Sequence, residues 1–222
     1  MAALIDQGRR ARARAASEER QRRILEVARE MLRRLPLGEV SLDTVCNRAD
    51  IKAGLASMYF GSRDELFLRI ARDEIDTWLD RVETIVRETA VGDLRALCHG
   101  IAADLASREL LVRVLAQAWT VLEGRVGTGE AMGFVRWQVD RAGAVGALLD
   151  TARPGGPAGA GARTILRLQQ QMAAWAQGAV PRGSLEVALA LPEMEAARCD
   201  LESEIRRFLE RELAADGAAP NT

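Results

Sequence analysis

The chain has 222 residues, of which 48% are hydrophobic and 28% are charged, so it can bury a core in one large domain or in a small domain joined to a larger one. No run of 18 apolar residues occurs and no apolar segment follows the first arginines, so we expect neither a membrane-spanning helix nor a secretory signal. The three cysteines are odd in number and widely spaced, which argues against a disulfide framework or a zinc site and favours a reducing cytoplasm.

Charge is distributed unevenly along the chain. Residues 1–63 carry 13 Lys and Arg against 8 Asp and Glu, a net charge of +5, whereas the remainder carries 18 against 24, a net charge of −6. This asymmetry indicates that only the N-terminal part meets a polyanion. Seven arginines lie between residues 9 and 23, and we expect residues 1–16 to form a flexible Arg-rich arm, with a merely solvated arm as the alternative.

Helical periodicity recurs throughout the sequence, and alternating strand patterns do not appear. The first helix is expected to begin at Ser17, whose side chain would cap it, and to end at Pro36. Ser41 is expected to cap a second, short helix, and a third should run from about Lys52 to Tyr59. The sequence "SRDE" at residues 62–65 predicts a capping box that opens a long fourth helix.

The rest of the chain is predicted to be helical as well. The Gly- and Pro-rich segment 153–163 predicts a loop between two packed helices, with a domain linker as the alternative. We therefore expect an all-α fold of about nine helices, with a helix-turn-helix domain at 17–62 and a helical ligand-binding and dimerisation domain at 63–216. The later helices are predicted near residues 93–106, 108–124, 129–152, 163–178 and 184–214, the last with a break at Pro192.

A short helix, a tight turn and a second helix between two longer helices form a helix-turn-helix, whose second helix enters the DNA major groove. Side chains on that helix must be exposed to read base edges, and flanking groups contact phosphates. Gly54 would let the backbone approach a phosphate closely. The residues expected to contact DNA are Ser41, Lys52, Ala53, Gly54, Ser57, Met58, Tyr59 and Arg63.

Three of these assignments have open alternatives. Lys52 could be a solvated lysine, although it is the only lysine of the chain. Met58 could pack partly into the core, and Arg63 could be an ordinary surface charge.

The same segment resembles the TetR family of bacterial transcriptional regulators, whose pattern is close to S-x-x-x-I-A-x-x-A-G-V-S-x-G-T-L-Y-x-H-F-x-S-K-E-x-L. Asp50 departs from it by replacing the usual turn glycine, and Lys52 by replacing the usual serine cap. The resemblance implies an all-helical homodimer whose three N-terminal helices bind a palindromic operator, and a C-terminal domain whose small-molecule effector releases the DNA. The matching positions are Ser41, Val45, Cys46, Ala49, Ile51, Gly54, Tyr59, Phe60, Ser62, Arg63, Asp64 and Leu66.

The C-terminal part offers aromatic and methionine side chains that could line an effector pocket, because such pockets are mostly apolar. Ordinary core packing is the alternative for each of them. Gln138 and Gln169 could orient a polar group of the ligand or lie in solvent, and the lone His99 is expected to be structural. The candidate ligand-binding residues are Trp78, Trp119, Met132, Phe134, Trp137, Met172 and Trp175.

The last two predicted helices each carry an apolar stripe, and packing these stripes against a two-fold copy would give a four-helix dimer interface. The alternative is that the stripes close the core of a single chain. The candidate interface residues are Ile165, Leu168, Met172, Leu201, Ile205 and Phe208.

Together these features predict a TetR-like regulator, more specifically a repressor with an activator as the open alternative, and its partners are an operator duplex, a second copy of itself and a small-molecule effector. The alternative is a helical small-molecule-binding protein without DNA function. We expect no enzymatic activity, metal or other cofactor, because no paired carboxylates, metal-ligand spacing or nucleophile–base set stands out.

Overall fold

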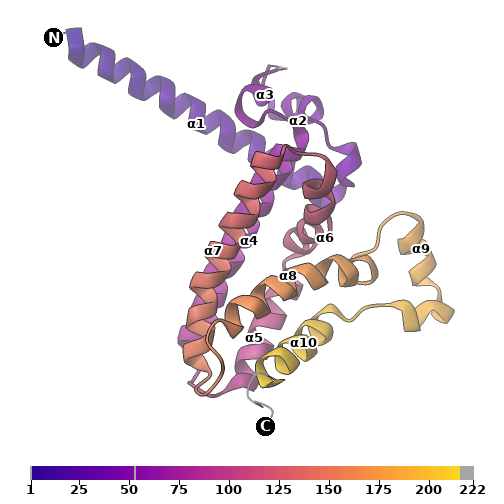
Figure 1. Cartoon of the computed structure of the whole chain (residues 1–222). Coiled ribbons are helices and arrows are strands. Elements are labelled where there is room, and N and C mark those ends of the chain that lie inside the picture. Colours follow the sequence, from indigo (N-terminus) through magenta and orange to yellow (C-terminus); the bar gives the residue numbers. More distant parts are fainter. Residues whose placement is uncertain (1, 53, 216–222) are drawn as a thin grey trace. The chain divides into compact units, whose positions relative to one another are not determined.

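The structure, a computed structural model, describes residues 2–52 and 54–215. These residues form ten α-helices and two short 3-10 helices and no strand, which confirms the predicted all-α fold (Figure 1). The elements are α1 (Ala2–Arg34), η1 (Leu37–Glu39), α2 (Leu42–Ala49), α3 (Leu55–Phe60), α4 (Arg63–Glu88), α5 (Leu94–Ser107), α6 (Glu109–Gly124), α7 (Thr128–Ala152), α8 (Ala160–Ala179), α9 (Ser184–Ala190), η2 (Pro192–Ala197) and α10 (Leu201–Ala215).

The chain divides into two compact units, residues 1–70 and 71–222. The predicted domain boundary at residues 62 and 63 coincides with the start of α4, whereas the units meet inside that helix. The Ser62 hydroxyl accepts a hydrogen bond from the Glu65 amide (3.1 Å) and starts α4 as the capping sequence predicts.

In the first unit, α1 packs on α2 and α3 through the C-terminal half of α1. Apolar side chains of this half, including Ile24, Ala28 and Met31, are buried. Ala56 and Phe60 bury the inner face of α3, and this packing fixes the direction in which its other face points.

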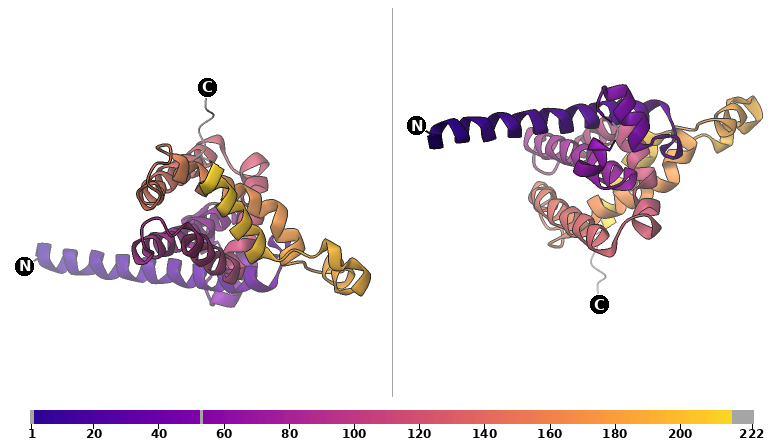
Figure 2. Two further views of the ribbon diagram at one scale, coloured as in Figure 1. Left: turned by 90° about the horizontal axis from the view of Figure 1, so that it is seen from below. Right: turned by 90° about the horizontal axis from the view of Figure 1, so that it is seen from above.

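Helix α1 begins much earlier than predicted. It runs without interruption from residue 2, so Ser17 lies inside it and is not a cap, and the expected arm of residues 1–16 is helical in its described part. Arginine and alanine are strong helix formers and dominate residues 9–16, so the helix has no reason to stop before Ser17. The right view of Figure 2 shows the N-terminal half of α1 continuing beyond α2 and α3.

Helix α3 is shorter than predicted, since it begins at Leu55 and not near Lys52. Gly54 adopts the left-handed conformation (φ 87°), which no helix interior allows, and no side chain caps the first turn. Lys52 therefore lies in the turn. Asp50 ends α2 in a left-handed conformation (φ 54°) that a short polar side chain tolerates, which explains how it replaces the usual glycine.

In the second unit, α7 packs along α8, α8 also packs on α6 and α10, and α10 packs on α5. The helices α7 and α8 approach so closely that a Cβ placed on Gly146 would lie 2.1 Å from the Ala162 backbone nitrogen. A Cβ on Gly161 would lie 2.3 Å from the Gly146 carbonyl oxygen. Only glycine fits at these two positions.

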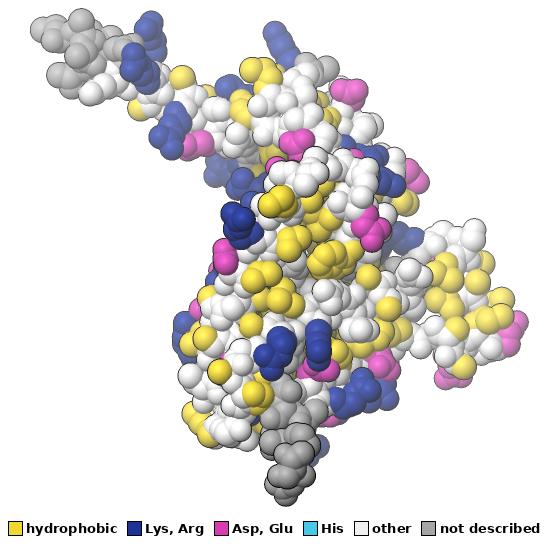
Figure 3. All heavy atoms as spheres, viewed as in Figure 1, with side chains coloured by type: hydrophobic (Ala, Val, Ile, Leu, Met, Phe, Trp, Pro, Cys, Tyr) yellow, Lys and Arg dark blue, Asp and Glu magenta, His cyan; other side chains and the backbone are white. Residues whose placement is uncertain are grey.

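The predicted loop at 153–163 is shorter in the structure, because α8 already begins at Ala160. The Asp150 carboxylate accepts hydrogen bonds from the amides of Gly159 (2.7 Å) and Gly161 (2.8 Å), which stabilises that start. The predicted last helix is divided into α9, η2 and α10, with Pro192 at the start of η2. Hydrophobic side chains are exposed on the α9 segment (Figure 3).

Candidate DNA-binding surface and ligand-binding core

The helix-turn-helix begins with a capping box at α2. The Ser41 hydroxyl accepts a hydrogen bond from the Thr44 amide (3.1 Å), and the Thr44 hydroxyl accepts one from the Ser41 amide (3.0 Å). Ser41 is exposed, so the helix start that it caps faces solvent. This is a suitable place for a phosphate, because the first amides of a helix attract anions.

The outer face of α3 presents the predicted base-reading side chains to solvent. Met58 is 78% exposed, so the alternative that it packs in the core is wrong. Ser57 is exposed as well, and its hydroxyl donates to the Gly54 carbonyl (2.7 Å), which leaves its oxygen lone pairs able to accept. The buried Ala56 and Phe60 hold this outer face in place.

The turn before α3 carries the only lysine of the chain. Lys52 is exposed, and its carbonyl accepts a hydrogen bond from the Leu55 amide (3.2 Å), so the turn is closed at its C-terminal end. Gly54 is exposed with open space around its Cα, as close approach to a backbone requires. The candidate Ala53 lies outside the described residues.

Tyr59 is not a free side chain, although it was predicted to contact a phosphate. Its hydroxyl lies 3.2 Å from the Ser17 hydroxyl and accepts a hydrogen bond from the Arg20 guanidinium (3.3 Å). The Ser17 and Arg20 hydrogen bonds lower the pKa of Tyr59, because they stabilise the ionised phenolate. These contacts tie α3 to α1 and join residues about 40 positions apart, so no local sequence pattern could reveal them.

Arg63 is also engaged within the fold. Its guanidinium pairs with the Asp64 carboxylate at 3.2 Å, and its side chain is 28% exposed. A phosphate could replace this partner only by competing with it. Arg23 is one of the seven arginines between residues 9 and 23. It donates a hydrogen bond from Nε to the Ala49 carbonyl (3.3 Å), one of the last carbonyls of α2, which have no partner within the helix.

The candidate ligand-binding residues differ in burial. Trp78, Phe134 and Met172 are fully buried, and the partly buried tryptophans lie on α6, α7 and α8. Trp175 packs edge-on against Phe208 with ring centroids 5.8 Å apart. Met132 is 58% exposed and lines a shallow apolar groove of about 490 Å³ along α7, so its assignment to a ligand pocket stays a prediction.

Arg72 completes an aromatic cluster that sequence reasoning missed. Its guanidinium lies 5.6 Å from the Phe134 ring centroid and 5.3 Å from that of Trp137, within the range of cation–π attraction. The two rings are 5.4 Å apart. One turn further along α7, Arg141 bridges to the carboxylates of Asp76 and Asp80, each at 2.7 Å.

A pair of buried amides lies between α7 and α8. Gln138 donates from Nε2 to the Gln169 side-chain carbonyl, and both residues are buried, so solvent exposure is excluded for them. Gln169 Nε2 and the buried Trp78 Nε1 have no acceptor in the described part of the chain. Such donors cost free energy unless a partner reaches them, and a ligand with a hydrogen-bond acceptor is one candidate partner.

The predicted dimer-interface residues are interior residues of one chain. Ile165, Leu168, Met172 and Ile205 are 0% exposed, and Leu201 and Phe208 are buried too. They pack α8 and α10 against the rest of the second unit, so the alternative that the stripes close the core of a single chain is correct. Any dimer must use other side chains.

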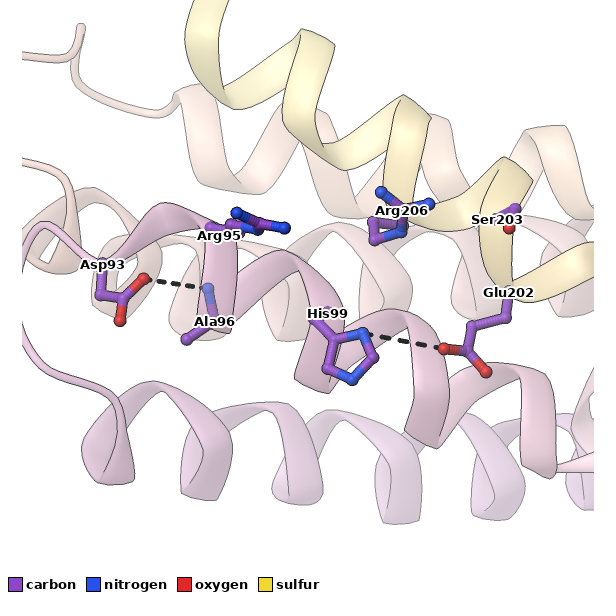
Figure 4. A pocket seen from close by; sticks show the side chains of 7 residues that line it. All are labelled: Asp93, Arg95, Ala96, His99, Glu202, Ser203 and Arg206. Carbon is purple, nitrogen blue, oxygen red and sulfur yellow. Dashed lines mark hydrogen bonds and ion pairs between the residues drawn. The ribbon is translucent and has the colours of Figure 1, made fainter.

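A polar groove of about 660 Å³ lies between the start of α5 and α10 (Figure 4). Arg95 and Arg206 line it, and the His99 ring lies 3.7 Å from the Glu202 carboxylate. His99 is exposed, and its contact with Glu202 joins α5 to α10, so the expectation of a structural role stays open. The two walls lie about 100 residues apart in sequence, which is why no motif marks the groove.

No group of three or more His, Cys, Asp or Glu side chains in the described part is arranged to hold a metal ion. No helix among the described residues is long and apolar enough to cross a membrane.

Comparison with known proteins identifies the family. The family model described as "Tetracyclin repressor-like, C-terminal domain" matches residues 72–214. No curated protein matches the sequence.

Solved structures have the same fold. A transcriptional regulator from Rhodococcus sp. Rha1 is 19% identical with a TM-score of 0.57, and the match covers 90% of this chain and 99% of that one. A regulatory protein of the TetR family from Rhodococcus RHA1 is 16% identical with a TM-score of 0.54, covering 90% and 98%. The family match covers most of the chain and the resemblance of residues 41–66 agrees with it, so the chain belongs to the TetR family of transcriptional regulators.

Proposed function

We propose that the chain is a repressor that binds an inverted-repeat operator as a homodimer and is released from it by a small molecule. The observation that carries the proposal is the outer face of α3, where Ser57 and Met58 are exposed on a helix fixed by the buried Ala56 and Phe60. A short helix that presents side chains of mixed chemistry to solvent suits the major groove.

The charge distribution supports DNA as the partner. The net charge of +5 over residues 1–63 brings that part of the chain toward phosphates, whereas the acidic remainder avoids them. Lys52 in the turn and the helix start at Ser41 would contact the backbone, and Ser57 and Met58 would contact base edges. In a homodimer the two copies of α3 would enter successive major grooves about 34–36 Å apart.

The effector would bind in the second unit. The unpaired N–H groups of Trp78 and Gln169 support a largely apolar ligand that carries a hydrogen-bond acceptor. Helix α4 belongs to both units, so a ligand that prefers one position of this helix would change DNA affinity. A coupling free energy of about 1–3 kcal/mol is typical of such systems. We propose no catalytic role for the chain.

Selection of bound duplexes from a random DNA pool tests the proposal. We expect an enriched inverted repeat whose half-sites are centred one helical turn, or a multiple of it, apart. An enriched site without two-fold symmetry would contradict the homodimer. No enrichment at all would contradict DNA binding and favour a helical ligand-binding protein.

A further inference from the structure

We propose that residues 7–16, the exposed part of α1 before Ser17, form a second DNA contact that binds phosphates beside the half-site read by α3. We call these residues the N-terminal extension. The inference rests on the proposed DNA-binding function and adds to it a separate, sequence-independent contact.

The extension has a charge density that matches duplex DNA. Arg9, Arg10, Arg12 and Arg14 are all exposed and span five residue steps, or about 7.5 Å of helix axis at 1.5 Å per residue. The three intervals between them average roughly 2.5 Å per positive charge, which is of the same order as the one phosphate per about 1.7 Å of duplex axis. Asp6 is the only acidic residue among residues 1–17, and Figure 3 shows basic side chains along this half of α1.

Helical geometry places two of the arginines on the side of α1 that meets α3. Helix α1 contacts Tyr59 through Ser17 (3.2 Å) and Arg20 (3.3 Å). Arg10 precedes Ser17 by seven residues and Arg9 precedes Arg20 by eleven, and both spacings return to nearly the same face of a helix. The N-terminal extension therefore continues along the axis of α1 beyond its contact with α3. Arg9 and Arg10 lie on the face of α1 that contacts α3 further along the helix.

The N-terminal extension is long enough to reach from α3 to the phosphates at the rim of the major groove. Arg10 lies about 10 Å along the helix axis from Ser17, at 1.5 Å per residue. The major groove is about 12 Å wide. A helix that starts beside α3 in the groove and runs on for about 10 Å passes the rim of the groove, where the phosphates lie. Because the arginines would meet this rim and not the base edges, the contact should be independent of sequence.

Burial in a core does not explain the arginines of the extension. No described side chain from residue 7 to residue 16 is buried. Arg14 pairs with Glu18 at 2.9 Å, but the two side chains are 83% and 64% exposed, and an exposed pair of this kind is weak and can be exchanged for a phosphate.

The test replaces Arg9, Arg10, Arg12 and Arg14 by alanine together and measures affinity for the selected operator duplex between about 50 and 200 mM salt. Alanine keeps the helix, which far-ultraviolet circular dichroism will check. We expect at least two phosphate contacts per protomer, so the slope of log affinity against log salt should become shallower by about 3.6 for the dimer. Over this fourfold range of salt, wild-type affinity should fall roughly 100-fold more than that of the variant.

A matched variant separates a local contact from a change in net charge. Alanine at Arg87, Arg95, Arg125 and Arg136 removes the same charge from exposed positions of the second unit, and its salt slope should equal that of the wild type. Equal slopes for the wild type and the extension variant would overturn the inference while leaving the proposed function intact. An equally shallower salt slope in both variants would also overturn the inference, because it would reflect net charge and not a local contact. If the wild type enriches no duplex at all, both proposals fall.

Discussion

At the scale of single residues, the Tyr59 hydroxyl reports on the contact between α1 and α3. Tyr59 is the only tyrosine of the chain, so its ionisation can be followed by ultraviolet absorbance without interference from another phenol. We expect its pKa to lie below the ordinary value of 10.0, because Ser17 and Arg20 stabilise the phenolate. Between the folded and the unfolded pKa the folded protein binds fewer protons, so this contribution to the free energy of unfolding grows as pH rises and is complete above the unfolded value.

Variants of the two partners provide the control for Tyr59. Ser17→Ala and Arg20→Gln should each move the titration back toward the ordinary value, because each removes one of the hydrogen bonds. Val187→Ala, an exposed position of α9, should leave the titration unchanged. An ordinary pKa in the wild type, or no response to either partner substitution, would contradict the contact.

Lys52 tests whether the turn before α3 binds a phosphate. Lys52→Ala should weaken operator binding on every sequence alike, and should make the salt slope shallower by about 1.8 for two protomers, since one contact is lost from each. Helicity should not change, because Lys52 is exposed and outside the helices. Lys52→Arg keeps the charge and should keep most of the affinity. Unchanged affinity of Lys52→Ala in a gel-shift titration would remove this residue from the site.

At the scale of helices, most elements could be predicted because their ends are coded locally. Ser41 and Ser62 start α2 and α4 through hydrogen bonds to amides three residues later, and the sequence alone shows both. Ser17 has the same side-chain chemistry as these two caps. A serine caps a helix only where the residues before it are not helical, and the arginines and alanines before Ser17 are helical. The late start of α3 depends on the left-handed Gly54, whose conformation a sequence does not specify.

The contact between α7 and α8 makes a sharp prediction about two glycines of one helix. Gly146→Ala should destabilise the protein by about 1–3 kcal/mol, because the new methyl group would overlap the backbone of Ala162. Gly143→Ala, three residues earlier, has open space and should stabilise by about 0.5–1 kcal/mol through helix propensity. Denaturant unfolding of the two variants measures the difference. Equal effects of the two substitutions would contradict the close approach of the helices.

At the scale of the whole molecule, apolar stripes predicted helices correctly but not the surface that each stripe meets. Leu168 and Ile205 lie on stripes that would suit a dimer, and the structure buries them within one chain. Met132 and Phe134 are two residues apart and have opposite surroundings, one exposed and one buried. Burial depends on neighbours that are distant in sequence, which periodicity cannot supply.

The burial of Leu168 predicts how its substitution will act. Leu168→Ala should lower the free energy of unfolding by about 2–5 kcal/mol, because it opens a cavity in the core of the second unit. The variant that remains folded should keep the assembly state of the wild type in sedimentation experiments. A Leu168→Ala variant that is folded and as stable as the wild type but dissociated would instead show that Leu168 lies in the dimer interface.

Recognition of the operator depends above all on the outer face of α3, and substitution of Met58 tests this most directly. The measurement is the affinity of the wild type and of Met58→Ala for the selected operator and for an unrelated duplex. We predict that the ratio of the two affinities falls by about 10-fold or more while affinity for the unrelated duplex is kept, since each mismatched base pair of a site costs about 1–3 kcal/mol and both protomers lose this apolar contact. An unchanged ratio for this 78% exposed side chain would contradict base reading by α3.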